Sequence, residues 1–594
     1  MSVENTKADA QLADYVIRNG LIFDGTGAPG VKGDLAIRDG KVVASGPELA
    51  VKAAREIDAA GCWVTPGFLD AHTHYDAEVE VMPGIEESVR HGVTTVVMGN
   101  CSLSTALGTE QELLDLFCRV ESLPREVLGS WLGGKVTWNS PRSYYEHLGG
   151  LPLGPNVASF LGHSNVRLAA MGLERSLTTP KATPEELAKM DGLVREALEA
   201  GFVGLSIDML PWHRMDGESY RGISVPSQQA DPSEYRRLAN IVREYDRVLQ
   251  ATPNALMKKT VMRLVGMTSG IGRKGLKTTI VAAMDVKTDR KVYRMATLLA
   301  RVANDVLRGN LRWQTLSEPF LNYCDGVFTP LFEEFPTGVE AISADASTRK
   351  FLFSDPVFRD RFRKDWEGRG QRLFHRDLAD MWVVSSPEEG HAGKSFAQIA
   401  SEAGVEPIVH FMDLMAQYDT AVRWKTEVTN DRPGPRRTLF ADKYTLPGFN
   451  DSGAHNRNMA FQDGGLRMLQ QIADHPETMP LEEAISKLTR RSAEWLGLDT
   501  GSIRVGDVAD VVVIDPEMLK TGLGPALEDY DDRMLGAMRM VKRSDGVVRN
   551  VLIGGRMAFE NGTFAEDFGH ARYGRLLRAG GVQGKTVEPE PVKV

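Results

Sequence analysis

"PGFLDAHTHYDAEV", from Pro66 to Val79, is the stretch of this 594-residue chain that decides its fold. It begins as an apolar segment and then places His72 and His74 one residue apart, with Asp70 and Asp76 on either side. In a β-strand, residues i and i+2 point to the same side. The spacing therefore predicts that the two imidazoles meet at one point, near the carboxyl end of a buried strand.

Further apolar segments could form strands parallel to this one, and helical segments separate many of them. They read "GVTTVVMGN", "NVASFLGHSN", "GFVGLSIDM", "RVLQATPN", "LKTTIVAAMD", "LRWQTLSEPF" and "LPGFNDSGAH". The clearest helix runs from Thr183 to Gly201, where Thr183 can cap the start, Glu186 completes a capping box and Gly201 ends the helix. Eight strands with covering helices predict an α/β fold of the TIM (β/α)8 barrel type.

The two chain ends differ from the middle of the sequence. Residues 1–64 and 500–594 alternate apolar and polar residues between Gly, Asn and Asp turns, as in "GDLAIRDGKVVASG" and "GSIRVGDVADVVVIDP". Because chain ends often lie close together, we expect both ends to build one small β-sandwich domain. Residues 65–499 would then form the barrel. A helical insertion around 330–446 is too long for one barrel unit and would belong either to the pocket or to a subunit contact.

Composition and charge indicate which partners and which compartment to expect. The formal net charge of −10 argues against nucleic acid. The four cysteines are too few and too scattered for a disulfide framework, which favours a reducing, cytoplasmic compartment. The N-terminus lacks an apolar signal core and no run of about 18 apolar residues occurs, so we expect no membrane partner. The sequence leaves open whether the chain forms a homo-oligomer.

Three further sites could join His72 and His74 around a metal ion. Cys101 in "GNCSLS" follows the second strand, although an isolated cysteine is more often a small buried thiol. Asp451 in "GFNDSGAH" closes the last strand and could ligate a metal and take a proton from water, or only form an Asx turn. His163 in "FLGHSNVR" follows the third strand and could equally be a satisfied residue of the barrel rim.

Taken in order, these stretches resemble the amidohydrolase superfamily, and within it the N-acyl-D-amino-acid deacylase (D-aminoacylase) group. The resemblance covers most of residues 14–290 and 445–560, and its Gly-Asn-Cys and Gly-His-Ser stretches are similar to that group. It implies a TIM barrel with a β-sandwich from both termini and a zinc-activated water that attacks an amide carbonyl. It also implies roles for matching positions: metal ligands at His72 and His74, a metal-bridging thiolate at Cys101, a ligand and proton shuttle at Asp451, and a pocket residue at His163.

The sequence departs from the group on the fifth and sixth strands, where the group has further metal histidines. Here the corresponding stretches read "VLQATPN" and "TTIVAAMDVK", and Gln250 and Asp285 are the nearest candidates. Glutamine is a poor zinc ligand, whereas aspartate is a reasonable one. We therefore expect one zinc ion rather than two, with these ligands: His72, His74 and Asp451, with Cys101 or Asp285 as a further one.

These features predict a metal-dependent amidohydrolase that cleaves a non-peptide amide bond in a small molecule, with an N-acyl amino acid favoured. Asp451 would carry the proton, and the metal with His163 would stabilise the oxyanion. An acyl amino acid has a carboxylate, which calls for a cation in the pocket. The substrate-binding candidates, each of which could instead be structural, are Arg167, Trp212, His213, His455 and Arg457.

Two alternatives remain at this point. One is a hydrolase of a cyclic or other small amide, because pocket loops decide the substrate within one fold. The other is a non-hydrolytic binding homologue that has lost part of the metal site.

Overall fold

The computed structural model describes residues 12–254, 257–368, 370 and 372–580. The chain forms an eight-stranded parallel sheet, and each of the predicted strand segments contributes to it. The strands, in their order across the sheet, are β6 (Phe68–Asp70), β8 (Val93–Met98), β9 (Asn156–Gly162), β10 (Gly204–Asp208), β11 (Val248–Thr252), β12 (Lys277–Ile280), β13 (Asn310–Gln314) and β17 (Thr445–Leu446).

A second pairing brings the two edges of this sheet together. β7 (His72–Thr73) continues from β6, and β18 (Phe449–Ser452) continues from β17. These two short strands pair in parallel, with Phe449 opposite His72. The sheet therefore curls, which is consistent with the TIM-like barrel that the sequence predicts. The closing pair also carries the first strand's histidines to the last strand's aspartate.

The strands are buried on both faces, which explains why they read as nearly continuous apolar runs. Helices cover the outer face, and among them α7 (Pro184–Ala200) confirms the helix predicted from sequence. Thr183 and Glu186 form the expected capping box, and Gly201 ends the helix with a φ of 105°. Met190, Val194 and Leu198 form the buried stripe of this helix.

Strands from both chain ends share one nine-stranded mixed sheet. Its N-terminal half and its C-terminal half meet where β5 (Trp63–Pro66) pairs antiparallel with β19 (Val511–Ile514). Since only Gly67 separates β5 from β6, this sheet leads directly into the barrel. Its other strands are β1 (Ala13–Ile22), β2 (Val31–Arg38), β3 (Lys41–Gly46), β4 (Ala53–Asp58), β22 (Val548–Ile553), β23 (Arg556–Glu560) and β24 (Thr563–Phe564).

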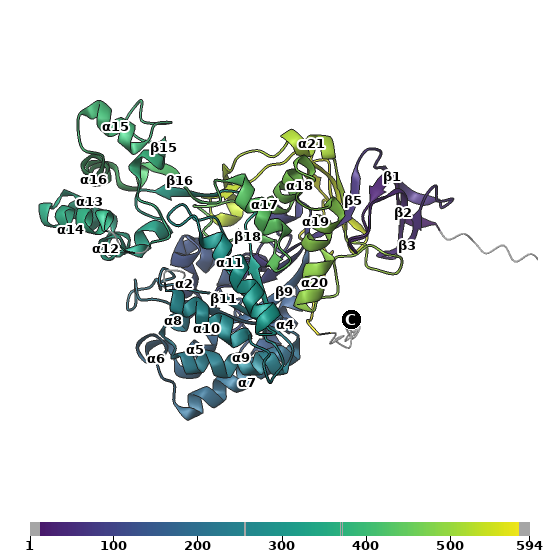
Figure 1. The fold of residues 1–594 in the computed structure, drawn as a ribbon, viewed down its shortest axis with the longest axis horizontal. Helices are drawn as coiled ribbons and strands as arrows, with labels where there is room; N and C mark the ends of the chain where they lie inside the picture. Colours follow the sequence, from purple (N-terminus) through teal and green to yellow (C-terminus); the bar gives the residue numbers. More distant parts are fainter. Residues whose placement is uncertain (1–11, 255–256, 369, 371, 581–594) are drawn as a thin grey trace, which may run out of the picture.

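The insertion forms a lobe that stands apart from the barrel in Figure 1. It contains the expected helices and also two strands of a small antiparallel sheet. The central β16 (Arg423–Thr429) pairs with β15 (Met381–Ser385) and with β14 (Phe320–Asp325), which precedes the insertion. Its aromatic core includes Phe332 and Trp424. The helices are α12 (Pro336–Ser343), α13 (Ala346–Ser354), α14 (Pro356–Glu367), α15 (Phe396–Ala403) and α16 (Pro407–Tyr418).

Membrane crossing requires a helix that is both long and strongly apolar, and none of the described helices meets that requirement.

The barrel depends on close backbone approach at Gly204, the first residue of β10. A Cβ added there would lie 1.7 Å from the carbonyl oxygen of Val248 in β11, so one strand must move. We expect Gly204→Ala to lower the free energy of unfolding by at least about 1–3 kcal/mol, as overpacking does. Denaturant unfolding followed by circular dichroism would measure this change.

Gly192→Ala is the matched control, because Gly192 lies exposed within α7 and an added Cβ meets nothing within 4 Å. Alanine in a helix interior is favoured over glycine, so this variant should gain roughly 0.5–1 kcal/mol. Equal stability of the two variants would contradict the strand-packing argument.

Candidate metal centre

Four side chains with metal-donor atoms converge where the barrel strands end. His72 Nε2 lies 3.2 Å from His74 Nε2 and 3.4 Å from Cys101 Sγ. Asp451 Oδ1 lies 3.4 Å from His72 Nε2 and 3.3 Å from His74 Nε2. The donor atoms of the two histidines and the cysteine all lie within 4.8 Å of one another, and all three residues are buried. The cluster could therefore hold a metal ion.

The outer nitrogen of each imidazole faces an acceptor. His72 Nδ1 lies 2.7 Å from Gln314 Oε1, and His74 Nδ1 lies 3.0 Å from Glu121 Oε1. These partners place a proton on each Nδ1 and turn the lone pair of each Nε2 toward the cluster. Two lone pairs 3.2 Å apart repel each other unless positive charge lies between them. The donor set thus fits a cation.

Without a metal ion, the protonation of His72 and His74 also places one positive charge in the cluster. Burial lowers the pKa of His72 to about 3, so that imidazole is neutral. Burial also disfavours charge on His74, but Glu121 and Asp451 outweigh it and hold the pKa of His74 well above its usual value. The proton on His74 therefore supplies the positive charge. Metal ligands must be deprotonated, so a bound ion would replace that proton.

The same balance acts on the other two donors. Burial raises the pKa of the Cys101 thiol to about 11, so without a cation it keeps its proton. Burial would raise the pKa of Asp451 as well, but the hydrogen bond and charge of His74 lower it below its usual range. Asp451 is a carboxylate in either case, whereas a coordinated thiol loses its proton.

The two aspartates of the opening stretch fix the loops that carry the other ligands. Asp70 accepts hydrogen bonds from Ser452 Oγ at 3.0 Å and Asn450 Nδ2 at 3.2 Å, which ties the first strand to the strand of Asp451. Asp76 Oδ2 accepts a hydrogen bond from the Gly99 N–H at 3.2 Å, just before Cys101. Burial raises the pKa of both aspartates to about 7.

The backbone is strained at the cluster. Cys101 and Asp451 have φ values of 50° and 51°, a left-handed conformation that such residues adopt only where the surroundings enforce it. Gln250 Oε1 accepts the Cys101 N–H at 3.0 Å, and Thr252 Oγ1 donates to Cys101 Sγ at 3.3 Å. Gln250 therefore positions the cysteine loop through its backbone.

Asp285, the candidate ligand near the sixth strand, does not reach the cluster. Arg432 binds both of its carboxylate oxygens, at 2.6 and 2.7 Å, and Arg290 adds a bond of 3.0 Å. The Asn430 side chain further accepts its backbone N–H. Arg432 from a distant segment and Arg290, five residues along the chain, hold this carboxylate away from the metal donors. This corrects the expectation that Asp285 is a metal ligand.

His163 and Arg167 also lie away from the cluster. The two ring nitrogens of His163 contact Ser227 Oγ and Glu234 Oε1, each at 2.9 Å, and Arg167 pairs with Glu234 at 2.6 Å. All are buried, and neither His163 nor Arg167 lines the cavity above the metal donors. The physical reason is local: α5 (His163–Met171) begins directly after β9, so His163 belongs to a helix rather than to the strand end.

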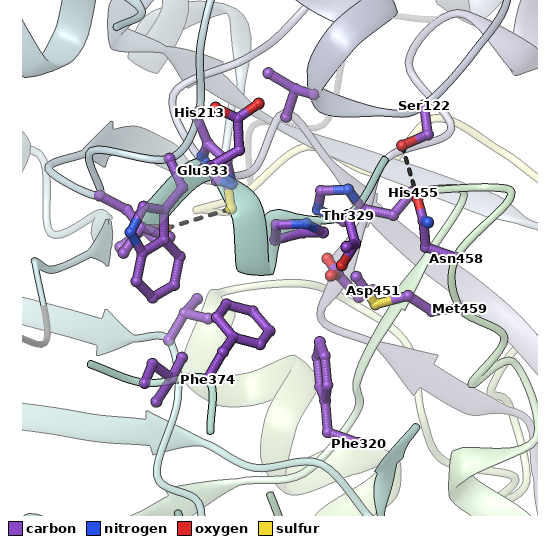
Figure 2. Close-up of a pocket in the computed structure, with 18 of the residues that line it drawn as sticks. Ser122, His213, Phe320, Thr329, Glu333, Phe374, Asp451, His455, Asn458 and Met459 are labelled. Atoms are coloured by element: carbon purple, nitrogen blue, oxygen red, sulfur yellow. Dashed lines mark hydrogen bonds between the residues drawn. The ribbon is translucent and has the colours of Figure 1, made fainter. Parts of the chain in front are cut away.

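The other four candidates for substrate binding line one cavity of about 1,370 Å³, which opens over His72, Cys101 and Asp451. They are Trp212, His213, His455 and Arg457. Figure 2 shows His213, His455 and Asp451 around the same space, with Phe320 and Phe374 facing them. Phe374 comes from the insertion, which therefore supplies part of the pocket wall, and Phe320 comes from β14 just before it.

Sequence reasoning missed three residues of the site. Glu121 and Gln314 orient the imidazoles, and Asp208 Oδ2 lies 2.7 Å from His213 Nδ1. Burial opposes charge on His213, but Asp208 outweighs it and raises the pKa of His213. Asp208 and Gln314 are each the last residue of a strand in the parallel sheet, a signal that could have identified them. Glu121 follows helix α2 (Glu110–Val120) and carries no such signal.

Comparison with known proteins gives a consistent picture. The Amidohydrolase family matches residues 55–249 and 394–559. A protein of Mycobacterium tuberculosis (strain H37Rv), named only as uncharacterized, is 40% identical over 96% of each chain. An N-acyl-D-glutamate deacylase of Alcaligenes xylosoxydans xylosoxydans is 35% identical, over 85% of this chain and 88% of its own.

Among solved structures, the fold matches an N-acyl-D-glutamate deacylase from Bordetella bronchiseptica, described as complexed with zinc and a phosphonate mimic of the tetrahedral intermediate. The TM-score is 0.63 at 21% identity, over 96% of this chain and all of the other.

The metal cluster can be tested by substituting first the expected ligands and then a residue that only contacts a ligand. Loss of an outer partner such as Gln314 typically costs about 10–100-fold in metal affinity, and loss of a ligand should cost more. We expect His72→Ala and His74→Ala to lose bound metal, Cys101→Ser to lose affinity, and Gln314→Ala to fall between them and the wild type. Elemental analysis of the purified variants would measure bound metal.

Cys62→Ser provides the matched control, because Cys62 is a buried cysteine directly before β5. This substitution should leave the metal content unchanged. Full metal content in both histidine variants would show that the cluster is not the metal site.

We expect the buried network of His163, Arg167 and Glu234 to stabilise the fold. Glu234→Ala leaves the buried charge of Arg167 unpaired, which should cost about 3–5 kcal/mol of unfolding free energy. Glu244→Ala, at the other end of α9 (Pro232–Glu244), removes an exposed pair with Arg195 and should cost less than about 1 kcal/mol. Chemical denaturation distinguishes the two, and similar losses would contradict the assignment.

Proposed function

Because this chain belongs to the amidohydrolase family of metal-dependent hydrolases, we propose that it hydrolyses the amide bond of a small N-acyl amino acid with one zinc ion. The observation that carries the proposal is the meeting of two imidazole nitrogens, one sulfur and one carboxylate oxygen at the floor of a large cavity. Zinc accepts this mixed donor set. The relatives named as deacylases support an N-acyl amino acid as the substrate class.

The ligands would be His72, His74, Cys101 and Asp451. A second ion has less support, since the fifth strand offers Gln250 and Asp285 is held by Arg432 and Arg290. When bound, the zinc ion supplies Lewis acidity, which polarises a carbonyl group and makes water a better nucleophile at neutral pH.

Asp451 is the residue best placed to carry the proton. Its side chain is 12% exposed and lines the cavity, whereas His72 is fully buried. Its lowered pKa keeps it ionised and able to accept a proton from the attacking water. The same carboxyl group would then deliver that proton to the leaving nitrogen.

His213 would stabilise the negative charge that develops on the carbonyl oxygen. Asp208 accepts a hydrogen bond from Nδ1, which leaves the other ring nitrogen as a donor toward the cavity. The raised pKa of His213 favours a cationic donor, which binds an oxyanion more strongly than a neutral one. This assignment replaces the role expected of His163.

Purified protein should be analysed for metal and then assayed against N-acetyl D- and L-amino acids and a cyclic amide. We expect about one zinc ion per chain and release of acetate from one stereochemical series. A folded, metal-free protein would favour the non-hydrolytic homologue, and turnover of the cyclic amide alone would favour the other alternative.

Asp451→Asn separates metal binding from proton transfer. Asparagine keeps the size and one oxygen but cannot accept the proton, and loss of a general base typically costs on the order of 10²–10⁴ in rate. We expect kcat to fall by this factor, with rates expressed per bound metal ion so that partial metal loss does not mimic the effect. A variant with wild-type kcat per ion would assign the proton to another group, and His213 would be the first to test.

A further inference from the structure

One wall of the cavity is apolar from the metal donors to the surface. Next to the sixth strand it is lined by Val281, Ala282 and Met284. Farther out, α10 (Lys258–Thr268) and α11 (Val292–Arg301), both labelled in Figure 1, line it with a second set of apolar side chains. That second set is Val261, Met262, Val292, Met295 and Leu299.

This apolar wall, defined by these two sets of residues, reaches solvent. Met262 and Met295 are 53% and 54% exposed, although both also line the cavity. Leu298, one helical turn from Met295, is 53% exposed as well. Exposed apolar surface continuous with a pocket marks a binding site more often than scattered apolar residues do.

The cavity is also larger than a short acyl group requires. Its volume of about 1,370 Å³ exceeds the roughly 300–1,000 Å³ of pockets that hold drug-sized ligands. Methionine side chains at Met262, Met284 and Met295 can adapt to a ligand of variable shape. A long, flexible and apolar ligand meets these conditions.

We infer that the acyl group of the substrate is a long hydrocarbon chain, which lies along the apolar wall and extends between α10 and α11. The inference rests on the proposed amide hydrolysis, and it specifies the class of substrate: an anionic amphiphile rather than a short acyl amino acid.

The charges around the outer end of the wall fit the anionic part of this description. Lys258 and Lys291 line the cavity, and the described residues offer neither side chain an ion pair. Residues 257–309 contain twelve Lys and Arg against three Asp, although the whole chain has a net charge of −10. Positive charge at a cavity mouth attracts anionic ligands and raises their rate of association.

The direct test is a series of substrates that differ only in acyl length. N-acetyl, N-hexanoyl and N-dodecanoyl derivatives would be prepared for the amino acid that is turned over fastest as its N-acetyl form. Burial of one methylene is worth about 0.8 kcal/mol, or roughly fourfold in binding. We therefore expect kcat/KM to rise more than about 100-fold from acetyl to dodecanoyl. A flat or falling series would overturn the inference and leave amide hydrolysis standing.

A binding measurement keeps the inference separate from the proposed function. Hexanoate and dodecanoate, each below its micellar concentration, would be titrated into the protein by calorimetry. Dodecanoate should bind at least about 30-fold more tightly. If it does and no amide is cleaved, the proposed function is wrong and the acyl site stands. Equal affinity of the two would overturn the acyl site.

Variants locate the effect on the wall. The double substitution Met262→Asn and Met295→Asn should lower the ratio of dodecanoyl to acetyl kcat/KM by at least about tenfold. Met518→Asn is the matched control, because Met518 is 40% exposed on α21 (Pro516–Thr521) and lies outside the cavity lining. Thermal melting would confirm that all variants fold. An equal loss in the control would show unspecific adsorption and contradict the inference.

Discussion

Two buried imidazole nitrogens 3.2 Å apart are the constraint on which the rest of this structure depends. They meet because His72 and His74 are two residues apart at the end of one strand, and because Gln314 and Glu121 turn both lone pairs inward. Such an arrangement is unfavourable without positive charge between the donors. A cation between the donors needs further ligands. Asp451 at the end of the last strand and Cys101 after the second strand lie at the same point and can serve as these ligands.

The chain holds this arrangement with buried carboxylates and strained backbone. Asp70 fastens the closing strand, Asp76 fastens the loop before Cys101, and left-handed conformations at Cys101 and Asp451 aim their side chains inward. Each feature costs stability when taken alone, because burial disfavours the charged carboxylate and positive φ crowds the side chain. They persist because the barrel around them is closely packed, as the contact between Gly204 and Val248 illustrates.

Short sequence patterns were enough to predict individual strands, one capped helix and the direction of the two histidines. The barrel strands are apolar runs, α7 has a complete cap at both ends, and the His72–His74 spacing follows strand periodicity. Contacts between distant segments could not be read in this way. Arg432, 147 positions from Asp285, removes that carboxylate from the cluster. The partners of the imidazoles are also distant in sequence, because Gln314 lies 242 positions from His72 and Glu121 lies 47 positions from His74.

The insertion and His163 show two other limits. The small antiparallel sheet pairs β14 with β16 across about a hundred intervening positions. A local pattern of alternating residues could not predict that pairing. His163 was expected at a strand end, but α5 begins at that residue and carries it into a buried pair with Glu234. The helix that follows the strand directly thus makes this side chain a structural residue and not a pocket residue.

The fifth and sixth strands, β11 and β12, carry no histidine, which bears on both the metal site and the acyl pocket. Gln250 holds the cysteine loop, and apolar side chains line the cavity beyond the sixth strand. One proposed ion would therefore take its ligands from His72, His74, Cys101 and Asp451, and the apolar wall would be left to the substrate. X-ray absorption at the zinc edge of the purified protein tests this account most directly. It should show one sulfur at about 2.3 Å together with nitrogen and oxygen ligands at about 2.0–2.2 Å. A zinc environment without sulfur would contradict it.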